Sequence, residues 1–258
     1  MIDGVLLDLS GVLHVGNTPL PGAVTALQRL RDSGVALRFV TNTTRSTRAM
    51  VASKLRGMGF ALADEEIFTA PRAACEYLAA HALRPLLLVH PGVLAEFDGV
   101  AQEEPNVVLL GDAGDSFDYH HMNAAFRLLM AGAPLLAMGR NRYFMDDDGL
   151  NLDAGPFVAA LEYAAGVKAS VLGKPAPAFY QAAVAALGCE AQHVVMVGDD
   201  VEADVLGAAA AGLQGILVQS GKYRAGDEAR LEGHTTRLLP DLAASVEWIL
   251  AQRHMPAP

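Results

Sequence analysis

Short apolar runs alternate with helical patterns at the start of the chain. The elements expected there are strands at residues 5–9 and 36–40 and helices at residues 21–33 and 46–58. In the helix at 21–33, the spacing of Val24, Leu27 and Leu30 places them on one face, and Gly34 then ends the helix. Strands that alternate with helices of this length predict a parallel sheet with helices on both faces.

The same alternation returns at the far end of the chain. The elements expected there are strands at residues 170–172, 193–197 and 215–218 and helices at residues 177–187, 202–211 and 241–251. Gly188 and Gly212 directly follow two of these helices, as expected of helix ends. The two ends together therefore predict one doubly wound α/β domain, and the tail at 254–258 is expected to fray.

The segment between these halves has strands and helices of its own. They are expected at residues 86–89, 107–110 and 135–137 for the strands and at residues 119–130 and 156–165 for the helices. A compact insertion in a doubly wound sheet would lie over the carboxyl ends of the strands, where such sheets bind ligands. We therefore predict a Rossmann-like α/β core made of residues 1–71 and 169–258, with an inserted α/β cap at residues 72–168.

Composition narrows the class of protein. The chain has 258 residues and is 52% hydrophobic, enough to bury a sizeable core. Its formal net charge of −10 argues against a nucleic-acid partner, and no apolar run approaches the roughly 20 residues of a membrane span. The N-terminus lacks the pattern of a signal peptide, and the two cysteines, Cys75 and Cys189, make no disulfide framework. These features favour a reduced cytoplasm.

Two polar motifs follow the first two predicted strands. Asp8-Leu9-Ser10-Gly11-Val12 ends the first strand, where a glycine turn can present the Asp8 carboxylate to the crevice. Thr41-Asn42-Thr43-Thr44 ends the second strand, where a hydroxyl and adjacent N–H groups can hold phosphate oxygens. Taken singly, a turn-forming aspartate and a helix N-cap explain these motifs equally well.

Two further polar motifs follow strands beyond the insertion. In Gly173-Lys174-Pro175 the lysine could neutralise a phosphate and a nucleophile, although alone it reads as a solvated loop residue. Gly198-Asp199-Asp200 is followed by Asp204. Clustered carboxylates repel one another unless a cation offsets the repulsion, and hard oxygen ligands in this number suit Mg²⁺. This last motif favours a functional site even in isolation.

The four motifs, in this order and each after a strand, resemble those of the haloacid dehalogenase superfamily. The insertion after the second motif resembles the C2-capped subfamily IIA. Within it, the chain is similar to two groups, the phospholysine phosphohistidine inorganic pyrophosphate phosphatases and the haloacid dehalogenase-like hydrolase domain-containing protein 2 group. The stretches that support this similarity are residues 123–129, 155–158 and 221–224.

The resemblance implies a role for each motif residue. Asp8 would attack phosphorus and carry an aspartyl-phosphate. Mg²⁺ would lie between the Asp8 carboxylate, the Ser10 carbonyl and Asp199, with Asp204 or Asp200 holding its waters or orienting Lys174. Thr41, the Asn42 backbone and Lys174 would clamp the phosphoryl oxygens of a small phosphorylated substrate. The resemblance also implies pairing into a homodimer through the caps.

Ser10 departs from the pattern of most phosphatases in this superfamily. They carry at this position a second aspartate that acts as general acid and base, a role that a hydroxyl cannot fill near neutral pH. Its loss costs roughly 10²–10⁴-fold where the leaving group must be protonated. Pyrophosphate, acyl or aryl phosphates and phosphoramidates avoid this cost, whereas alkyl phosphates do not. The two similar groups share the Asp-x-Ser arrangement, which favours P–N and P–O–P substrates.

Two other functions fit the same residues. A dehalogenase would use Asp8 to attack carbon, but that reaction does not need the Mg²⁺ site formed by the Ser10 carbonyl and Asp199. A slow or non-catalytic phosphate-binding protein would keep the site without efficient turnover. Phosphate release that depends strictly on the metal distinguishes both from a phosphatase.

Some polar residues outside the four motifs are open to two interpretations. Arg45 either touches the substrate or lies on the surface, and Asn141, Arg142 and Asp153 either face the active site or are ordinary loop residues. The pair His120-His121 has no third ligand at usual spacing and is expected on the surface. The acidic segment at residues 146–149 is expected to form a solvated turn rather than a calcium loop.

Overall fold

The computed structural model describes residues 1–146 and 149–253, which form two compact units. The first unit contains Met1–Thr41, Arg48–Phe68 and the described residues from Lys174 onward, and the second contains Asn42–Thr47 and Thr69–Gly173. These borders differ from those of the predicted domains chiefly at Asn42–Thr47, which groups with the second unit. The predicted turn at 146–149 includes two residues outside the description, and the tail at 254–258 lies outside it entirely.

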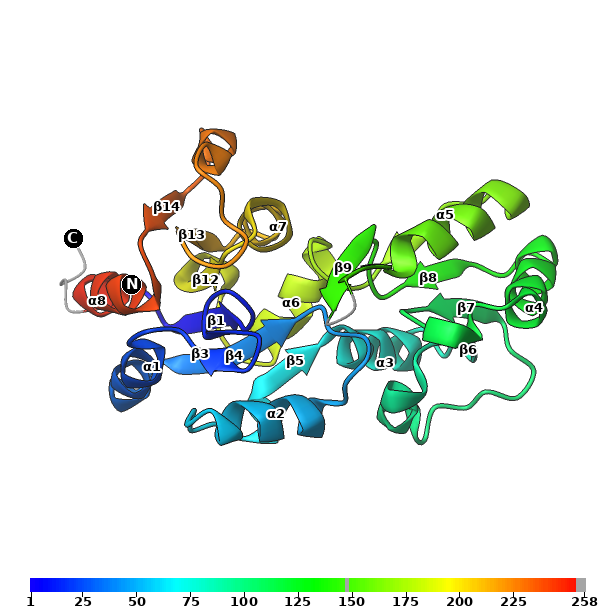
Figure 1. Cartoon of the computed structure of the whole chain (residues 1–258), viewed down its shortest axis with the longest axis horizontal. Coiled ribbons are helices and arrows are strands. Elements are labelled where there is room, and N and C mark those ends of the chain that lie inside the picture. The colour runs from blue at the N-terminus through cyan, green and yellow to red at the C-terminus, as the bar shows by residue number, and fades with distance from the viewer. Residues whose placement is uncertain (147–148, 254–258) are drawn as a thin grey trace. The chain divides into compact units, whose positions relative to one another are not determined.

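A six-stranded sheet forms the centre of the first unit (Figure 1). Its strands, in spatial order, are β14 (Thr236–Leu239), β13 (Gln214–Val218), β12 (Val194–Gly198), β1 (Gly4–Asp8), β4 (Ala36–Thr41) and β5 (Ile67–Thr69). β1 pairs in parallel with both β12 and β4, so it lies in the middle of the sheet. All five residues of β1 are buried, as expected of a strand covered on both faces.

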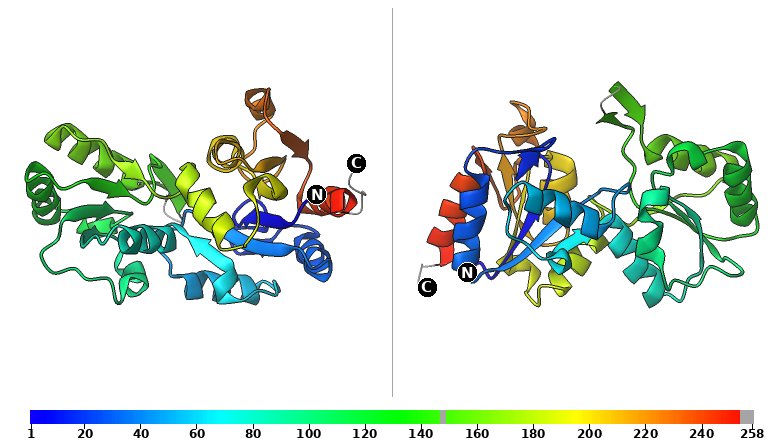
Figure 2. Two further views of the ribbon diagram at one scale, coloured as in Figure 1. Left: turned by 180° about the vertical axis from the view of Figure 1, so that it is seen from behind. Right: turned by 60° about the horizontal axis from the view of Figure 1, so that its bottom comes forward.

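Helices cover this sheet on both sides, as the alternating pattern predicts. They are α1 (Ala23–Asp32), α2 (Arg48–Gly57), α6 (Pro177–Ala185), α7 (Gly207–Ala210) and α8 (Leu242–Arg253). On one face, α1 and α8 lie side by side and pack against alternate residues of the central strands, including Val5 and Leu7 (Figure 2). A short hairpin of β2 (His14–Val15) and β3 (Thr18–Pro19) follows the first strand. The sheet therefore buries both faces and leaves its carboxyl edge for polar groups.

The second unit has a parallel sheet of its own. Its strands, in spatial order, are β11 (Ser170–Val171), β8 (Leu135–Ala137), β7 (Val107–Leu110) and β6 (Pro85–Leu88). Helix α3 (Ala70–Ala80) packs on one face, and α4 (Tyr119–Met130) and α5 (Ala154–Ala165) pack on the other. An antiparallel hairpin of β9 (Tyr143–Asp146) and β10 (Gly149–Leu152) completes the unit.

The predicted α/β class with parallel sheets is confirmed, two local predictions need correction, and one helix was not predicted. The strand expected at 170–172 exists as β11, but it pairs with β8 in the second unit rather than extending the core sheet. The continuous helix expected at 202–211 is instead a π-helix at Val201–Leu206 followed by α7. The sequence patterns also missed α3, whose buried face consists mainly of small residues such as Ala70, Ala73 and Ala74.

Among the described helices, none combines the length and the apolar character needed to cross a bilayer.

Candidate active site

Asp8 lies at the carboxyl end of the central strand β1. Its neighbours β12 and β4 hold β1 in register from Gly4 onward, which fixes the position of the carboxylate. Asp8 is buried, with only 7% of its surface exposed. Because Asp199 directly follows the adjacent strand β12, the parallel pairing brings the two aspartates to the same edge of the sheet.

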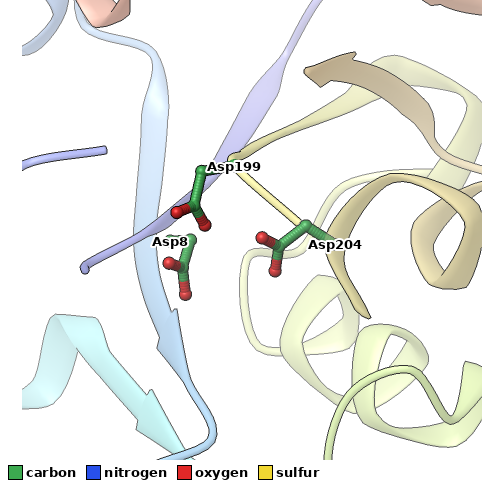
Figure 3. A group of neighbouring side chains, drawn as sticks. All are labelled: Asp8, Asp199 and Asp204. Carbon is green, nitrogen blue, oxygen red and sulfur yellow. The ribbon is translucent and has the colours of Figure 1, made fainter. Parts of the chain in front are cut away.

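A third carboxylate joins them from the π-helix. Oxygen atoms of Asp8, Asp199 and Asp204 all lie within 4.8 Å of one another, and all three residues are buried. Figure 3 shows these side chains converging from three separate segments of the first unit. Such a group of hard oxygen ligands is what Mg²⁺ prefers.

Lys174 provides the positive charge inside this cluster. Its ammonium nitrogen donates to Asp8 Oδ1 at 2.5 Å and to Asp204 Oδ1 at 2.6 Å. Lys174 is the only buried lysine or arginine among the described residues. Three carboxylates against one ammonium leave two negative charges in a buried site, and a divalent cation would neutralise them.

Burial and mutual repulsion shift the pKa values of these groups. Burial, and next the negative charge of Asp8, raise the pKa of Asp199 to about 6. Burial also raises the pKa of Asp204, against the opposing attraction of Lys174. For Lys174, burial lowers the pKa, but the attraction of Asp204 and Asp8 outweighs it and holds the pKa well above its usual value. Lys174 therefore stays charged, and Asp199 and Asp204 keep their protons to a higher pH than an ordinary aspartate does.

The π-helix places the Asp204 side chain over β12. Its first turn is capped by Asp200, whose carboxylate accepts N–H groups from Glu202 and Ala203. A side chain at Gly198 would overlap with Asp204, so this close approach requires glycine there. The hydroxyl of buried Tyr180 donates to the carbonyl of Ala203, which ties the π-helix to α6. π-Helical turns commonly occur at functional sites, where they redirect a side chain.

The structure separates the roles expected of Asp200 and Asp204. Asp204 bonds Lys174, whereas Asp200 caps the π-helix and its carboxylate lies 3.6 Å from the exposed Lys222 ammonium. The sequence left both open as partners of the metal or of Lys174. Asp204 is the one that lies in the cluster.

Ser10, Thr41 and Asn42 lie at or just beyond the ends of their strands, as expected. Ser10 is exposed in the loop after β1, where it makes an isolated bridge with His14. Thr41 is the last residue of β4 in the first unit, and Asn42 is the first residue that groups with the second unit.

Other candidates from the sequence lie within the second unit. Arg45 forms an ion pair with buried Asp112 and places its guanidinium 4.4 Å from the centre of the Phe144 ring. Burial raises the pKa of Asp153, and a hydrogen bond from Asn141 opposes the shift. Arg45, Asn141 and Asp153 therefore have structural partners in this unit.

The remaining candidates of that unit lie on its surface. Arg142 is exposed, as are His120 and His121 in the first turn of α4. His121 bonds the helix-capping Asp118. This arrangement agrees with the surface pair that the sequence predicted.

Residues 221–224 supported only the family resemblance in the sequence, and the contact of their loop with the site was not predicted. The loop after β13 bonds Asp199 through the N–H of Lys222 at 2.7 Å and bonds the Gly11 carbonyl through the hydroxyl of Ser220 at 2.6 Å. Its position at the carboxyl end of another parallel strand was the available signal, because ligand sites gather at that edge.

The chain is similar to known hydrolases along most of its length. A family model described as haloacid dehalogenase-like hydrolase matches residues 5–102, and a HAD-hydrolase-like model matches residues 171–245. The phospholysine phosphohistidine inorganic pyrophosphate phosphatase of Homo sapiens is 42% identical over 255 residues, which cover 96% of this chain and 94% of that protein. The human haloacid dehalogenase-like hydrolase domain-containing protein 2 is 46% identical over 230 residues, 89% of each chain.

A solved structure agrees with these relatives. The glycerol phosphate phosphatase of Mycobacterium tuberculosis, in complex with magnesium, has a TM-score of 0.84 to this chain at 29% sequence identity. The match covers 94% of this chain and 76% of that chain.

Proposed function

Because the chain belongs to the haloacid dehalogenase-like hydrolases, we propose that it is a Mg²⁺-dependent phosphatase that acts through an aspartyl-phosphate on Asp8. The observation that supports this most directly is the buried group of Asp8, Asp199 and Asp204 around Lys174. Three carboxylates with one ammonium suit a divalent cation, and a magnesium complex of a structurally similar phosphatase agrees with that choice.

Each residue of the site has a place in this chemistry. The Asp8 carboxylate attacks phosphorus, and the bond from phosphorus to the leaving group breaks. Water then cleaves the acyl phosphate, which returns the carboxylate and releases phosphate with the proton of that water. Lys174 and Thr41 clamp the phosphoryl oxygens, and Asp204 keeps Lys174 in place.

Asp8, the Ser10 carbonyl and Asp199 would hold the metal. When bound, Mg²⁺ neutralises the charge that develops on the phosphoryl group. We assign the second unit the role of a C2-type cap that selects the substrate, and we retain the homodimer and the cytoplasmic location as predictions from the sequence.

Ser10 narrows the class of substrate. With no carboxyl group at this position to protonate a leaving alkoxide, the enzyme favours leaving groups that are stable anions or that are protonated on nitrogen. The name of one relative includes phospholysine, phosphohistidine and inorganic pyrophosphate, whose bonds are P–N and P–O–P. We therefore propose a small P–O–P or P–N compound as the substrate.

Phosphate release across a panel of substrates tests this proposal. With Mg²⁺, we expect release from pyrophosphate, a phosphoramidate and p-nitrophenyl phosphate to exceed release from alkyl phosphates such as sugar phosphates. Ser10→Asp should raise turnover of the alkyl phosphates by roughly 10²-fold relative to pyrophosphate, because it supplies the missing acid. An unchanged ratio would refute this account of Ser10.

Two controls are needed to interpret phosphate release across the panel of substrates. EDTA should abolish release, and metal-independent cleavage of a carbon–halogen bond would favour a dehalogenase instead. If no substrate releases phosphate while vanadate still raises the melting temperature, the protein is a phosphate-binding relative without turnover.

The affinity for Mg²⁺ is expected to fall as the pH drops below about 6. The pKa of Asp199 is raised to about 6, so a proton competes with the metal for this carboxylate at lower pH. One competing proton weakens binding about tenfold at pH 5 compared with pH 7.5. The stability of the metal-free protein changes with pH in the opposite direction. Because the pKa of Asp199 is raised on folding, its contribution to the free energy of unfolding is lost as the pH rises from about 4 to about 6.

Calorimetric titration with Mg²⁺ at pH 5 and pH 7.5 measures this change directly. The matched variant is Asp199→Asn, which should bind weakly and lose most of the pH dependence. Equal affinities at the two pH values in the wild-type protein would contradict the prediction.

A further inference from the structure

The loop at Ser220, Gly221 and Lys222 lies against the proposed metal-binding edge of the first unit. It follows β13, which neighbours β12 in the sheet. Ser220 Oγ donates to the Gly11 carbonyl at 2.6 Å, and the backbone N–H of Lys222 donates to Asp199 Oδ2 at 2.7 Å. The loop therefore connects the segment after β1 to the aspartate after β12.

Two glycines allow this close approach. Gly11 and Gly221 have φ values of +87° and +59°, in the region that favours glycine. A Cβ on either residue would overlap with Asp199 Oδ2, and a Cβ on Gly221 would also lie 2.5 Å from the Gly11 Cα. Two backbone segments thus enclose one carboxylate oxygen, which leaves no room for any side chain.

The loop fixes the orientation of the Asp199 carboxylate. Asp199 is 2% exposed, and with Oδ2 held by Lys222 the carboxylate cannot rotate freely about its Cβ–Cγ bond. The direction of Oδ1 is then fixed as well. Hydrogen bonds of this kind behind a ligand typically change metal affinity by about 10–100-fold.

The same loop steadies the Ser10 carbonyl. That carbonyl shares a planar peptide group with the Gly11 N–H, which donates to the His14 carbonyl at 2.7 Å. Ser220 holds the next carbonyl, that of Gly11. The peptide group between Ser10 and Gly11 is held through its N–H, and the next peptide group is held through the Gly11 carbonyl. These two bonds fix the direction of the Ser10 carbonyl.

We infer that Ser220, Gly221 and the Lys222 amide form a positioning loop that sets the affinity of the site for Mg²⁺. This inference rests on the proposed function, because it assumes that Asp199 and the Ser10 carbonyl bind the metal. The loop acts by holding these two ligands in their binding orientation, through its bonds to Asp199 and to the Gly11 carbonyl.

Calorimetric Mg²⁺ titration of loop variants tests the inference without relying on turnover. Gly221→Ala should raise the dissociation constant at least tenfold, because the new methyl group displaces Asp199. The matched control is Gly16→Ala, at φ +57° with nothing within 4 Å of the added carbon. Both variants take on the same backbone strain, so only the first should lose affinity.

Ser220→Ala provides an independent arm should Gly221→Ala fail to fold. It removes a hydroxyl–carbonyl bond of 2.6 Å, and Ser33→Ala removes one of the same length, to Leu30, far from the site. Ser220→Ala should weaken Mg²⁺ binding severalfold and raise the Mg²⁺ concentration for half-maximal activity, with excess Mg²⁺ restoring the rate. Ser33→Ala should change neither.

The outcomes separate the two proposals. A wild-type protein that binds no Mg²⁺ would contradict the proposed function and this inference together. A wild-type protein that binds Mg²⁺ and releases phosphate, with loop variants that bind equally well, would overturn the positioning loop alone. Equal losses in the loop variants and in their matched controls would also overturn it.

Discussion

Asp8→Asn is expected to reduce phosphate release by about 10⁴-fold or more. The amide has nearly the shape of the carboxylate and can still accept the Lys174 bond made by Oδ1, but it cannot attack phosphorus. A loss of activity would therefore reflect the loss of the nucleophile and not a change in the structure of the site. Acid-quenched turnover followed by intact-mass measurement should show a phosphoryl adduct in the wild-type protein and none in the variant.

Two controls separate chemistry from folding. Asp32→Asn makes the same change of charge on the exposed side of α1, and it should leave release unchanged. In EDTA, Asp8→Asn should melt no lower than the wild-type protein, because it removes one of three mutually repelling carboxylates. Release by Asp8→Asn within tenfold of wild type would exclude Asp8 as the nucleophile.

Lys174→Met is expected to destabilise the metal-free protein by about 3–5 kcal/mol and to abolish turnover. The lysine is buried between Asp8 and Asp204, and its removal leaves both carboxylates without their cation. Breaking a buried ion pair from one side costs this much because the remaining charge stays out of water. Urea denaturation in EDTA at pH 7.5 measures the free energy of unfolding.

Comparison variants identify the source of that loss. Lys54→Met removes an exposed lysine from α2 and should change stability by less than about 0.5 kcal/mol. Adding Asp204→Asn to Lys174→Met should recover part of the loss, because one of the two uncompensated charges disappears. The deficit of Lys174→Met should also shrink toward pH 5, because burial raises the pKa of Asp204 and this carboxylate binds a proton there. A deficit independent of pH and of Asp204 would point to lost packing instead.

The sequence by itself determined the class of fold and singled out four residues that the structure brings together. Alternating strands and helices predicted the parallel α/β architecture, because the periods of the two elements differ and are visible in the apolar positions. Asp8 and Asp199 stood out because each lies at the end of a predicted strand, and parallel strands end at one edge of the sheet. Lys174 was predicted at the same edge, although the strand before it, β11, belongs to the second unit, and Asp204 was predicted from its spacing to Asp199. The structure places these four side chains together in the first unit.

Only the tertiary structure decided how these groups are arranged. The π-helix decides between Asp200 and Asp204. It packs closely over Gly198 and is bonded by Tyr180, and it has no periodic signal of its own in the sequence. The pairing of β11 with β8 was likewise invisible, since a two-residue strand does not specify its partner. The contact of Ser220 with Gly11 joins residues 209 positions apart. Contacts of this kind depend on the fold as a whole, whereas strand and helix patterns are local properties of the chain.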